Sequence, residues 1–147
     1  MMIRTVLAAA LVVVGVSAVI AQSSDPIAAR RALMKANGDA AKAGAGMAKG
    51  EAPFDLAKAK AIFVTFEDAA NKMPNLFPDN SKTGGDTAAL PAVWENMADF
   101  KAKFTKFGAD AKEAQGATKD LDTFKASFGN VTKNCGGCHE KYRAKKS

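Results

Sequence analysis

The sequence has few of the residues from which many functional sites are built. Its 147 residues include one histidine, one tryptophan, one tyrosine and two cysteines. A site that needs several imidazoles is therefore excluded, and two cysteines are too few for a disulfide-stapled scaffold. Hydrophobic residues make up 48% of the chain and charged residues 24%, as in an ordinary globular protein, so the sequence predicts one folded domain.

Several classes of function lack their signatures as well. The sequence contains no phosphate-binding loop and no stripe of basic and aromatic residues that would bind nucleic acid. With a single histidine, no catalytic grouping around a second imidazole is possible, so we expect a protein that is not an enzyme. The formal net charge of +6 is moderate, and it favours docking of an acidic partner over a nucleic-acid groove.

Residues 1–21 are predicted to be a secretory signal peptide. Arg4 gives a positive start, residues 6–20 are almost wholly apolar, and Ala21 is a small residue before a cleavage point. A membrane anchor is the alternative, but the apolar run is shorter than the roughly 20 residues that span a bilayer. We therefore expect a mature domain of residues 22–147, exported to the periplasm of a Gram-negative bacterium and free of the membrane. Free thiols rarely persist in that compartment, so both cysteines need a covalent partner.

Start and stop signals predict four helices and no strand. Asp25 before Pro26 is a helix start and Gly50 is a helix stop, which bounds a first helix over residues 26–49. Proline, glycine and small polar residues fill a long loop over about residues 71–89. The remaining helices are expected over about residues 55–72, about residues 90–115, and from about residues 118–120 towards the C-terminus.

Apolar residues recur at steps of three and four in the last three helices, which puts one apolar stripe on each. Three stripes must face one another, which predicts an all-α fold, an antiparallel four-helix bundle. The first helix is instead rich in alanine and glycine over residues 40–46, so either a bulky group approaches its backbone or it packs tightly on its neighbours or on a second subunit. The predicted stripes are Leu56, Ala59, Phe63, Phe66, Ala70 and Met73; Val93, Met97, Phe100, Phe104, Phe107 and Ala111; and Leu121, Phe124, Phe128, Val131, Cys135, Cys138 and Tyr142.

The one sharp motif in the chain is Cys135-Gly136-Gly137-Cys138-His139. C-x-x-C-H is the attachment signature of c-type haem. Each thiol adds to a haem vinyl group to form a thioether, and the adjacent imidazole binds the iron. Because the chain has no other histidine, a bound haem would take His139 as its proximal iron ligand.

Three other uses of the two cysteines compete with haem attachment. A disulfide between Cys135 and Cys138 would close a very short loop and add little stability. A thioredoxin-like redox pair follows a strand, and no strand is predicted before the motif. A zinc site would need further cysteine or histidine ligands, which the sequence does not contain. One covalent haem c with its iron is therefore the cofactor that the sequence predicts.

A C-x-x-C-H motif near the C-terminus of an exported four-helix bundle resembles the class II c-type cytochromes. These are the cytochrome c' family, including its low-spin c-556-type members. The resemblance covers the whole mature chain, and Arg30, Trp94 and the pair Tyr142-Arg143 match the family's pattern. Class I cytochromes c carry the haem motif near the N-terminus instead.

The resemblance implies two roles on the first helix. In the low-spin members a methionine of this helix binds the iron, whereas in the gas-binding members an apolar side chain covers a vacant site. Matching the family pattern puts Met34 at this distal position and Arg30 near the haem propionates. Core filling is the alternative role for Met34, since methionine adapts to irregular gaps. Met47 faces nearly the opposite side of an ideal helix.

We therefore expect a periplasmic one-electron carrier with iron ligated by His139 and Met34. The alternative is a five-coordinate cytochrome c'-type protein that binds nitric oxide or carbon monoxide. The expected partners are redox proteins with an acidic surface, because a basic cluster follows the motif and would attract them. This cluster is Lys141, Arg143, Lys145 and Lys146. Family members also include dimers that use the first two helices, so a homodimer is a further expectation.

Overall fold

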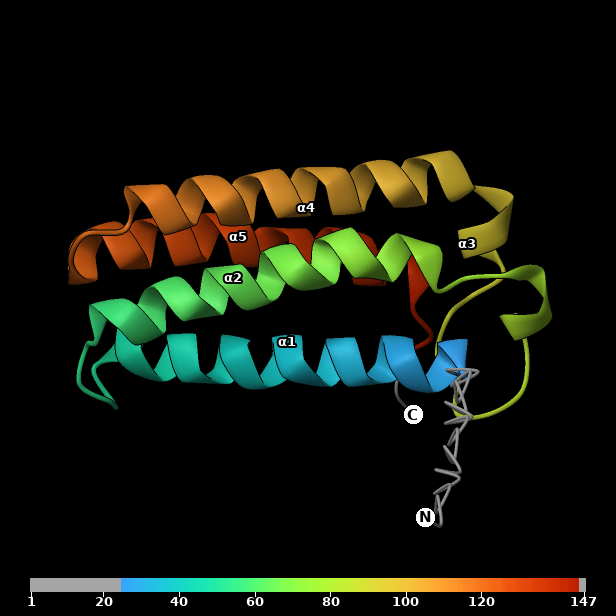
Figure 1. The fold of residues 1–147 in the computed structure, drawn as a ribbon, viewed down its shortest axis with the longest axis horizontal. Coiled ribbons are helices and arrows are strands. Elements are labelled where there is room, and N and C mark those ends of the chain that lie inside the picture. The colour runs from blue at the N-terminus through green and yellow to red at the C-terminus, as the bar shows by residue number, and fades with distance from the viewer. Residues whose placement is uncertain (1–24, 146–147) are drawn as a thin grey trace, which may run out of the picture.

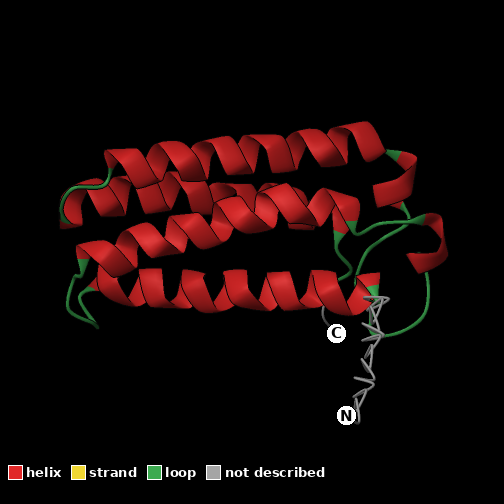
Figure 2. Cartoon of the chain, viewed as in Figure 1, coloured by secondary structure: helices red, strands yellow, loops and turns green. Residues whose placement is uncertain are grey.

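The computed structural model describes residues 25–145, so the predicted signal peptide lies outside the described residues. Four long helices and one short helix dominate this part of the chain (Figures 1 and 2). They are α1 (Pro26–Lys49), α2 (Leu56–Lys72), α3 (Ala92–Glu95), α4 (Met97–Ala117) and α5 (Leu121–Tyr142), and two short 3-10 turns at Met73–Asn75 and Asp79–Ser81 lie between α2 and α3. The described residues contain no strand, only an isolated bridge between Ala89 and Arg143.

The long helices form one antiparallel bundle. Figure 1 shows α1, α2, α4 and α5 lying along the same axis, with each helix running opposite to the one before it. The long connection between α2 and α3 lies at one end of the bundle. Helix α2 packs on both α1 and α4, and α4 packs on α5. The predicted all-α, antiparallel four-helix bundle is therefore confirmed.

The predicted start and stop signals bound the first helix correctly. The Asp25 carboxylate accepts a hydrogen bond from the backbone N–H of Ile27 at 2.9 Å. At the other end Gly50 takes a left-handed conformation with φ of 77°, which glycine adopts without steric cost. Asp55 caps α2 in the same way as Asp25 caps α1, and Asp120 forms a reciprocal capping box with Thr123 at the start of α5.

The prediction of the third helix is wrong in one respect, because the structure divides this segment into two helices. Residues 92–95 form the separate helix α3, and α4 begins only at Met97. Between them Asn96 leaves the helical conformation with φ of −127° and ψ of 43°. Its side-chain amide donates to the carbonyl of Ala92 at 3.3 Å, the kind of local hydrogen bond by which asparagine competes with a helix. The helix also continues past the predicted stop at Gly116 to Ala117.

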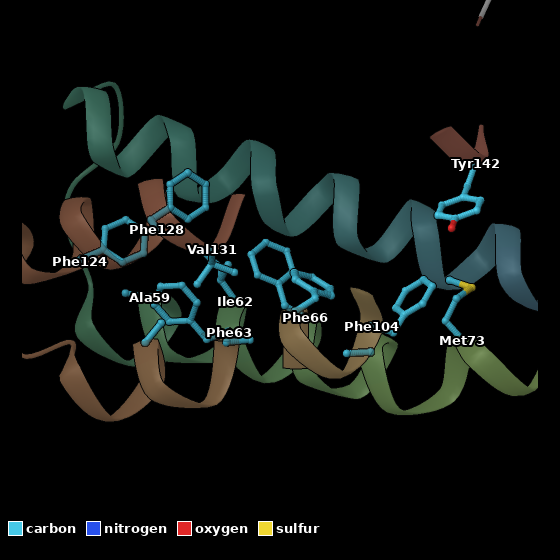
Figure 3. Close-up of a cluster of buried hydrophobic side chains, with 14 of the residues drawn as sticks. Ala59, Ile62, Phe63, Phe66, Met73, Phe104, Phe124, Phe128, Val131 and Tyr142 are labelled. Carbon is cyan, nitrogen blue, oxygen red and sulfur yellow. The ribbon is translucent and has the colours of Figure 1, made fainter. Parts of the chain in front are cut away.

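The core follows the predicted stripes and is dominated by phenylalanine. Figure 3 shows Phe124 and Phe128 gathered with Ile62 and Val131 towards one end of the bundle, and Phe104, Met73 and Tyr142 towards the other. Leu56, the first residue of α2, was predicted in a stripe but is 39% exposed. Met97 and Leu121, also first in their helices, are only half-buried.

Helices α1 and α5 meet closely at one point. Gly44 of α1 packs so tightly against the ring of Phe128 that a Cβ atom at this position would overlap the ring. A glycine is therefore needed here by close approach of the two helices, and not by backbone conformation, since its backbone is helical.

We predict that Gly44→Ala lowers the free energy of unfolding by about 1–3 kcal/mol, because the added methyl group overpacks the contact with Phe128. Urea denaturation of the purified protein measures this change. The control is Gly38→Ala in the same helix, where an added Cβ has no atom within 4 Å, so this variant should be unchanged or more stable by up to about 1 kcal/mol. Equal stability of the two variants would show that the Phe128 ring moves aside.

Candidate haem site

The motif residues lie in the last turns of α5. Cys135 and Cys138 are three residues apart on this helix, both are half-buried, and neither is in a disulfide. Burial raises the pKa of both cysteine side chains, so they are neutral thiols near pH 7. Two free thiols at helical spacing are the groups that thioether attachment requires.

His139 follows directly on the same turn and is also half-buried. Burial lowers the pKa of its imidazole, and the positive charge of Arg143 lowers it further. The ring is therefore neutral near pH 7 and keeps a free lone pair, which is the form that binds a metal.

Facing stretches of α1 and α5 are left without buried residues. In α1 no residue between Arg30 and Gly44 is buried, and in α5 none is buried between Val131 and Tyr142. Outside the contact of Gly44 with Phe128, these stretches are therefore only partly covered by protein. Their half-buried side chains are Leu33, Met34, Asn37, Ala40 and Ala41 on α1 and Thr132, Asn134, Cys135, Cys138 and His139 on α5.

The antiparallel register brings Met34 to the level of the motif. The two helices run in opposite directions and touch at Gly44 and Phe128 (Figure 1). Met34 precedes Gly44 by ten residues, and Cys138 follows Phe128 by ten. At 1.5 Å per residue both lie about 15 Å along their helices from the contact. Met34 is thus level with Cys138 and His139 on the opposite wall.

A buried polar atom on α1 also lacks a partner. Among the described residues Asn37 Oδ1 is the one buried side-chain oxygen or nitrogen without a hydrogen bond. An unsatisfied buried acceptor costs about 1–3 kcal/mol, so this face is poorly suited to simple protein packing. Uncovered inner faces, two thiols and a neutral imidazole together fit a haem between α1 and α5.

Arg30 holds the long loop that precedes α3. Arg30 as a whole is only 5% exposed. Nη1 donates to the carbonyl of Leu76 at 3.0 Å and to Ser81 Oγ at 2.9 Å, and Nη2 donates to the carbonyl of Ser81 at 2.8 Å and to Thr87 Oγ1 at 2.6 Å. The guanidinium also lies over the ring of Phe77, 4.7 Å from its centre. Sequence reasoning assigned Arg30 to the propionates and missed this role, because the loop acceptors carry no motif.

The buried charge of Arg30 is not matched by a carboxylate. No ion pair to Arg30 occurs among residues 25–145, although its neighbour Arg31 pairs with Asp86 at 2.8 Å on the surface. Burial lowers the pKa of the guanidinium, against the weaker opposing effect of Asp25. An anionic group on the inner face would therefore be stabilised by Arg30.

The turn after His139 is fixed to α4. The hydroxyl of Tyr142 donates to Asp99 Oδ2, and Lys141 Nζ donates to the same oxygen at 3.0 Å. These two donors lower the pKa of the Asp99 carboxylate. The backbone N–H of Leu90 donates to the carbonyl of Tyr142 at 3.0 Å, which ties the turn to the loop as well. Sequence reasoning placed Tyr142 in an apolar stripe but did not identify Asp99 as its partner.

A groove of about 590 Å³ lies between α4 and α5. It is lined by Cys138, by small and apolar residues and by charged residues, among them Lys103, Lys106, Asp110 and Lys133. Charged walls suit the apolar faces of a macrocycle poorly, which favours a haem bed between α1 and α5. Because Cys138 borders it, a group attached to that sulfur would have an edge near solvent there.

Comparisons with known proteins give a consistent result. The family described as Cytochrome C' matches residues 25–143. A cytochrome c' of Rhodopseudomonas palustris is 48% identical over 147 residues, all of both chains, and a cytochrome c-556 of the same organism is 36% identical over 98% of this chain and 99% of its own. The solved structure of cytochrome c' from Rhodopseudomonas palustris matches with a TM-score of 0.81 at 49% identity, covering 84% of this chain and 99% of the other.

We predict that Arg30→Met lowers the free energy of unfolding by about 2–3 kcal/mol, because it removes four charge-assisted hydrogen bonds and leaves buried loop acceptors without donors. Chemical denaturation measures the loss. Arg31→Met is the matched control, since the exposed pair with Asp86 contributes at most about 1 kcal/mol. Similar losses in the two variants would contradict the role given to Arg30.

Proposed function

This chain belongs to the cytochrome c' family, and we propose that it is an exported one-electron carrier with haem iron bound between His139 and Met34. Haem c is the cofactor of this family, and it supplies an iron that cycles between ferric and ferrous. The protein's own residues attach it, orient it and keep water from its faces.

Each residue of the site has one task in this proposal. Cys135 and Cys138 form the thioethers, and His139 gives its neutral imidazole to the iron. Met34 gives its thioether sulfur from the opposite wall, and Arg30 supplies positive charge for the propionates. Iron with both axial positions filled changes its coordination little when its oxidation state changes, so electron transfer needs little rearrangement of the protein.

One observation carries the assignment of Met34. Counting from the contact of Gly44 with Phe128, Met34 stands level with His139, on a stretch of α1 that has no buried residue. A methionine that only filled the core would be expected among the buried residues, as Met47 is, with an exposed fraction of 5%. Met34 is half-buried and lies on the edge of the core.

The second candidate function is binding of nitric oxide or carbon monoxide at an open iron site. Overall similarity favours it, since identity to the cytochrome c' is 48% and identity to the cytochrome c-556 is 36%. In that case Met34 would cover the vacant side of the haem without binding iron. The two functions differ in this one side chain, so the choice is open to a direct experiment.

Location and partners follow from the proposed function. No helix within residues 25–145 is long and apolar enough to cross a membrane, and an exported electron carrier would meet redox proteins in the periplasm. Lys141 of the predicted basic cluster is already paired with Asp99, whereas Arg143 and Lys145 are exposed, and further lysines line the groove at Cys138. These charges would favour an acidic partner near the Cys138 edge.

A homodimer would form at a different surface, a shallow apolar hollow between α1 and α2 that includes Ala29, Ala32 and Leu33.

We predict that haem stays on the protein through acid–acetone extraction and that the intact mass exceeds that of the chain by one haem. The physical reason is that the thioethers at Cys135 and Cys138 survive denaturation. Changing both cysteines to serine should release the haem on extraction, while Ser127→Ala within the same helix should retain it. Loss of haem from the unmodified protein would rule out covalent attachment.

We predict a low-spin ferric protein with a weak near-infrared thioether-to-iron band and slow or absent binding of carbon monoxide to the ferrous form. Met34→Leu should remove the band, open the sixth site to carbon monoxide and lower the reduction potential, because a thioether favours ferrous iron. Met47→Leu is the matched control and should change none of these, since its side chain packs in the core. A high-spin unmodified protein that binds carbon monoxide readily would favour the second function.

A further inference from the structure

The amide of Asn37 has no use in the fold. Its Oδ1 atom is buried and lacks a hydrogen-bond partner among the described residues. Asn37 and Gly38 are both weak helix formers, and they stand in the middle of a helix of 24 residues. The half-buried side chains on the same face of α1 are apolar or small, namely Leu33, Met34, Ala40 and Ala41. Packing alone would favour an apolar residue at position 37.

The position of Asn37 places it beside the distal ligand. It follows Met34 by three residues, so the two Cβ atoms lie about 5–6 Å apart on the same side of α1. In the register set by Gly44 and Phe128, Asn37 stands level with Cys135, one turn along from the level of Met34 and Cys138. The amide and the methionine side chain therefore project from the same side of α1, one turn apart.

We propose that Asn37 is a positioning residue for Met34, with its side-chain N–H donating a hydrogen bond to the Met34 sulfur. The inference rests on the proposed function, since it takes Met34 as the iron ligand. A half-turn of the amide about its last bond exchanges Oδ1 and Nδ2, so the buried place can hold the donor. A thioether sulfur is a weak acceptor, but a hydrogen bond in a site without water is stronger than the same bond in water.

This hydrogen bond would act on the iron in two ways. It fixes the rotamer of a flexible side chain, so that the sulfur keeps one orientation. It also withdraws electron density from the sulfur, which weakens donation to ferric iron more than to ferrous iron. Asn37 thus favours the reduced form of the protein and holds Met34 against competing ligands.

The test compares Asn37→Leu with the unmodified haem protein in four measurements: reduction potential, near-infrared thioether band, carbon monoxide binding and urea denaturation. We expect the ratio of ferrous to ferric protein at a fixed potential to fall about tenfold. For one electron this corresponds to a reduction potential that is lower by about 59 mV. Carbon monoxide should bind the ferrous variant about tenfold faster, because Met34 leaves the iron more readily. Stability should change little, because a weak hydrogen bond to sulfur is exchanged for apolar contacts.

Three further variants make the result specific. Asn37→Gln keeps an N–H donor. Its reduction potential should therefore be closer to that of the unmodified protein than the reduction potential of Asn37→Leu is. Asn37→Ala gives the same readout with a smaller side chain if the leucine variant does not fold. Asn71→Leu removes an exposed amide on α2 and should change neither potential nor band.

The outcomes separate this inference from the proposed function. A thioether band that is present in the unmodified protein and unmoved in Asn37→Leu, with an unchanged potential, overturns the role of Asn37 alone. Absence of the band from the unmodified protein overturns Met34 as ligand and the hydrogen bond with it. A lower potential in Asn37→Leu that Asn37→Gln largely restores supports the inference.

Discussion

The tight contact between Gly44 and Phe128 is the constraint on which the rest of the structure depends. It brings α1 and α5 together at one end, where phenylalanines from three helices fill the core. Beyond it no residue is buried between Arg30 and Gly44 of α1 or between Val131 and Tyr142 of α5. Burial of apolar surface contributes roughly 25 cal/mol per Å², so a macrocycle covering both faces would stabilise the fold as well as supply the iron. Haem binding would in this way be coupled to folding.

Two sets of hydrogen bonds close the other end of the bundle and define the space left there. Arg30 ties α1 to the long loop, and Asp99 ties α4 to the turn after His139. In each set, the donor and the acceptor come from segments that are far apart in the sequence. Because the loop and the C-terminal turn are fixed from different helices, His139 is held on a rigid wall, which is what a ligand needs for unchanged geometry in two oxidation states.

The sequence predicts most of this fold because its signals are local. Caps such as Asp25 and Gly50, together with apolar steps of three and four, locate the four long helices. The break at Asn96 was missed, because it depends on a side chain competing with the backbone at one position. The loop contacts of Arg30 and the unpaired oxygen of Asn37 were missed for another reason: they are tertiary facts, visible only when α1 has been placed against its neighbours. Covalent haem attachment could be predicted from the C-x-x-C-H motif alone. The position of Met34 opposite Cys138 and His139 could be found only from the register of two antiparallel helices.

Whether the protein carries electrons or binds a gas would depend on a part of α1 that contributes little to the core. Met34 and Asn37 are half-buried and lie outside the set of fully buried residues that determines the bundle. Because both positions lie outside that set, overall identity mainly reflects the scaffold and is weaker evidence about the sixth ligand than the residue at position 34 itself. This explains how one family includes proteins named for both c' and c-556 types with the same fold. In the proposed function, the outcome therefore depends on two adjacent turns of one helix face, where Met34 would bind the iron and Asn37 would position its sulfur.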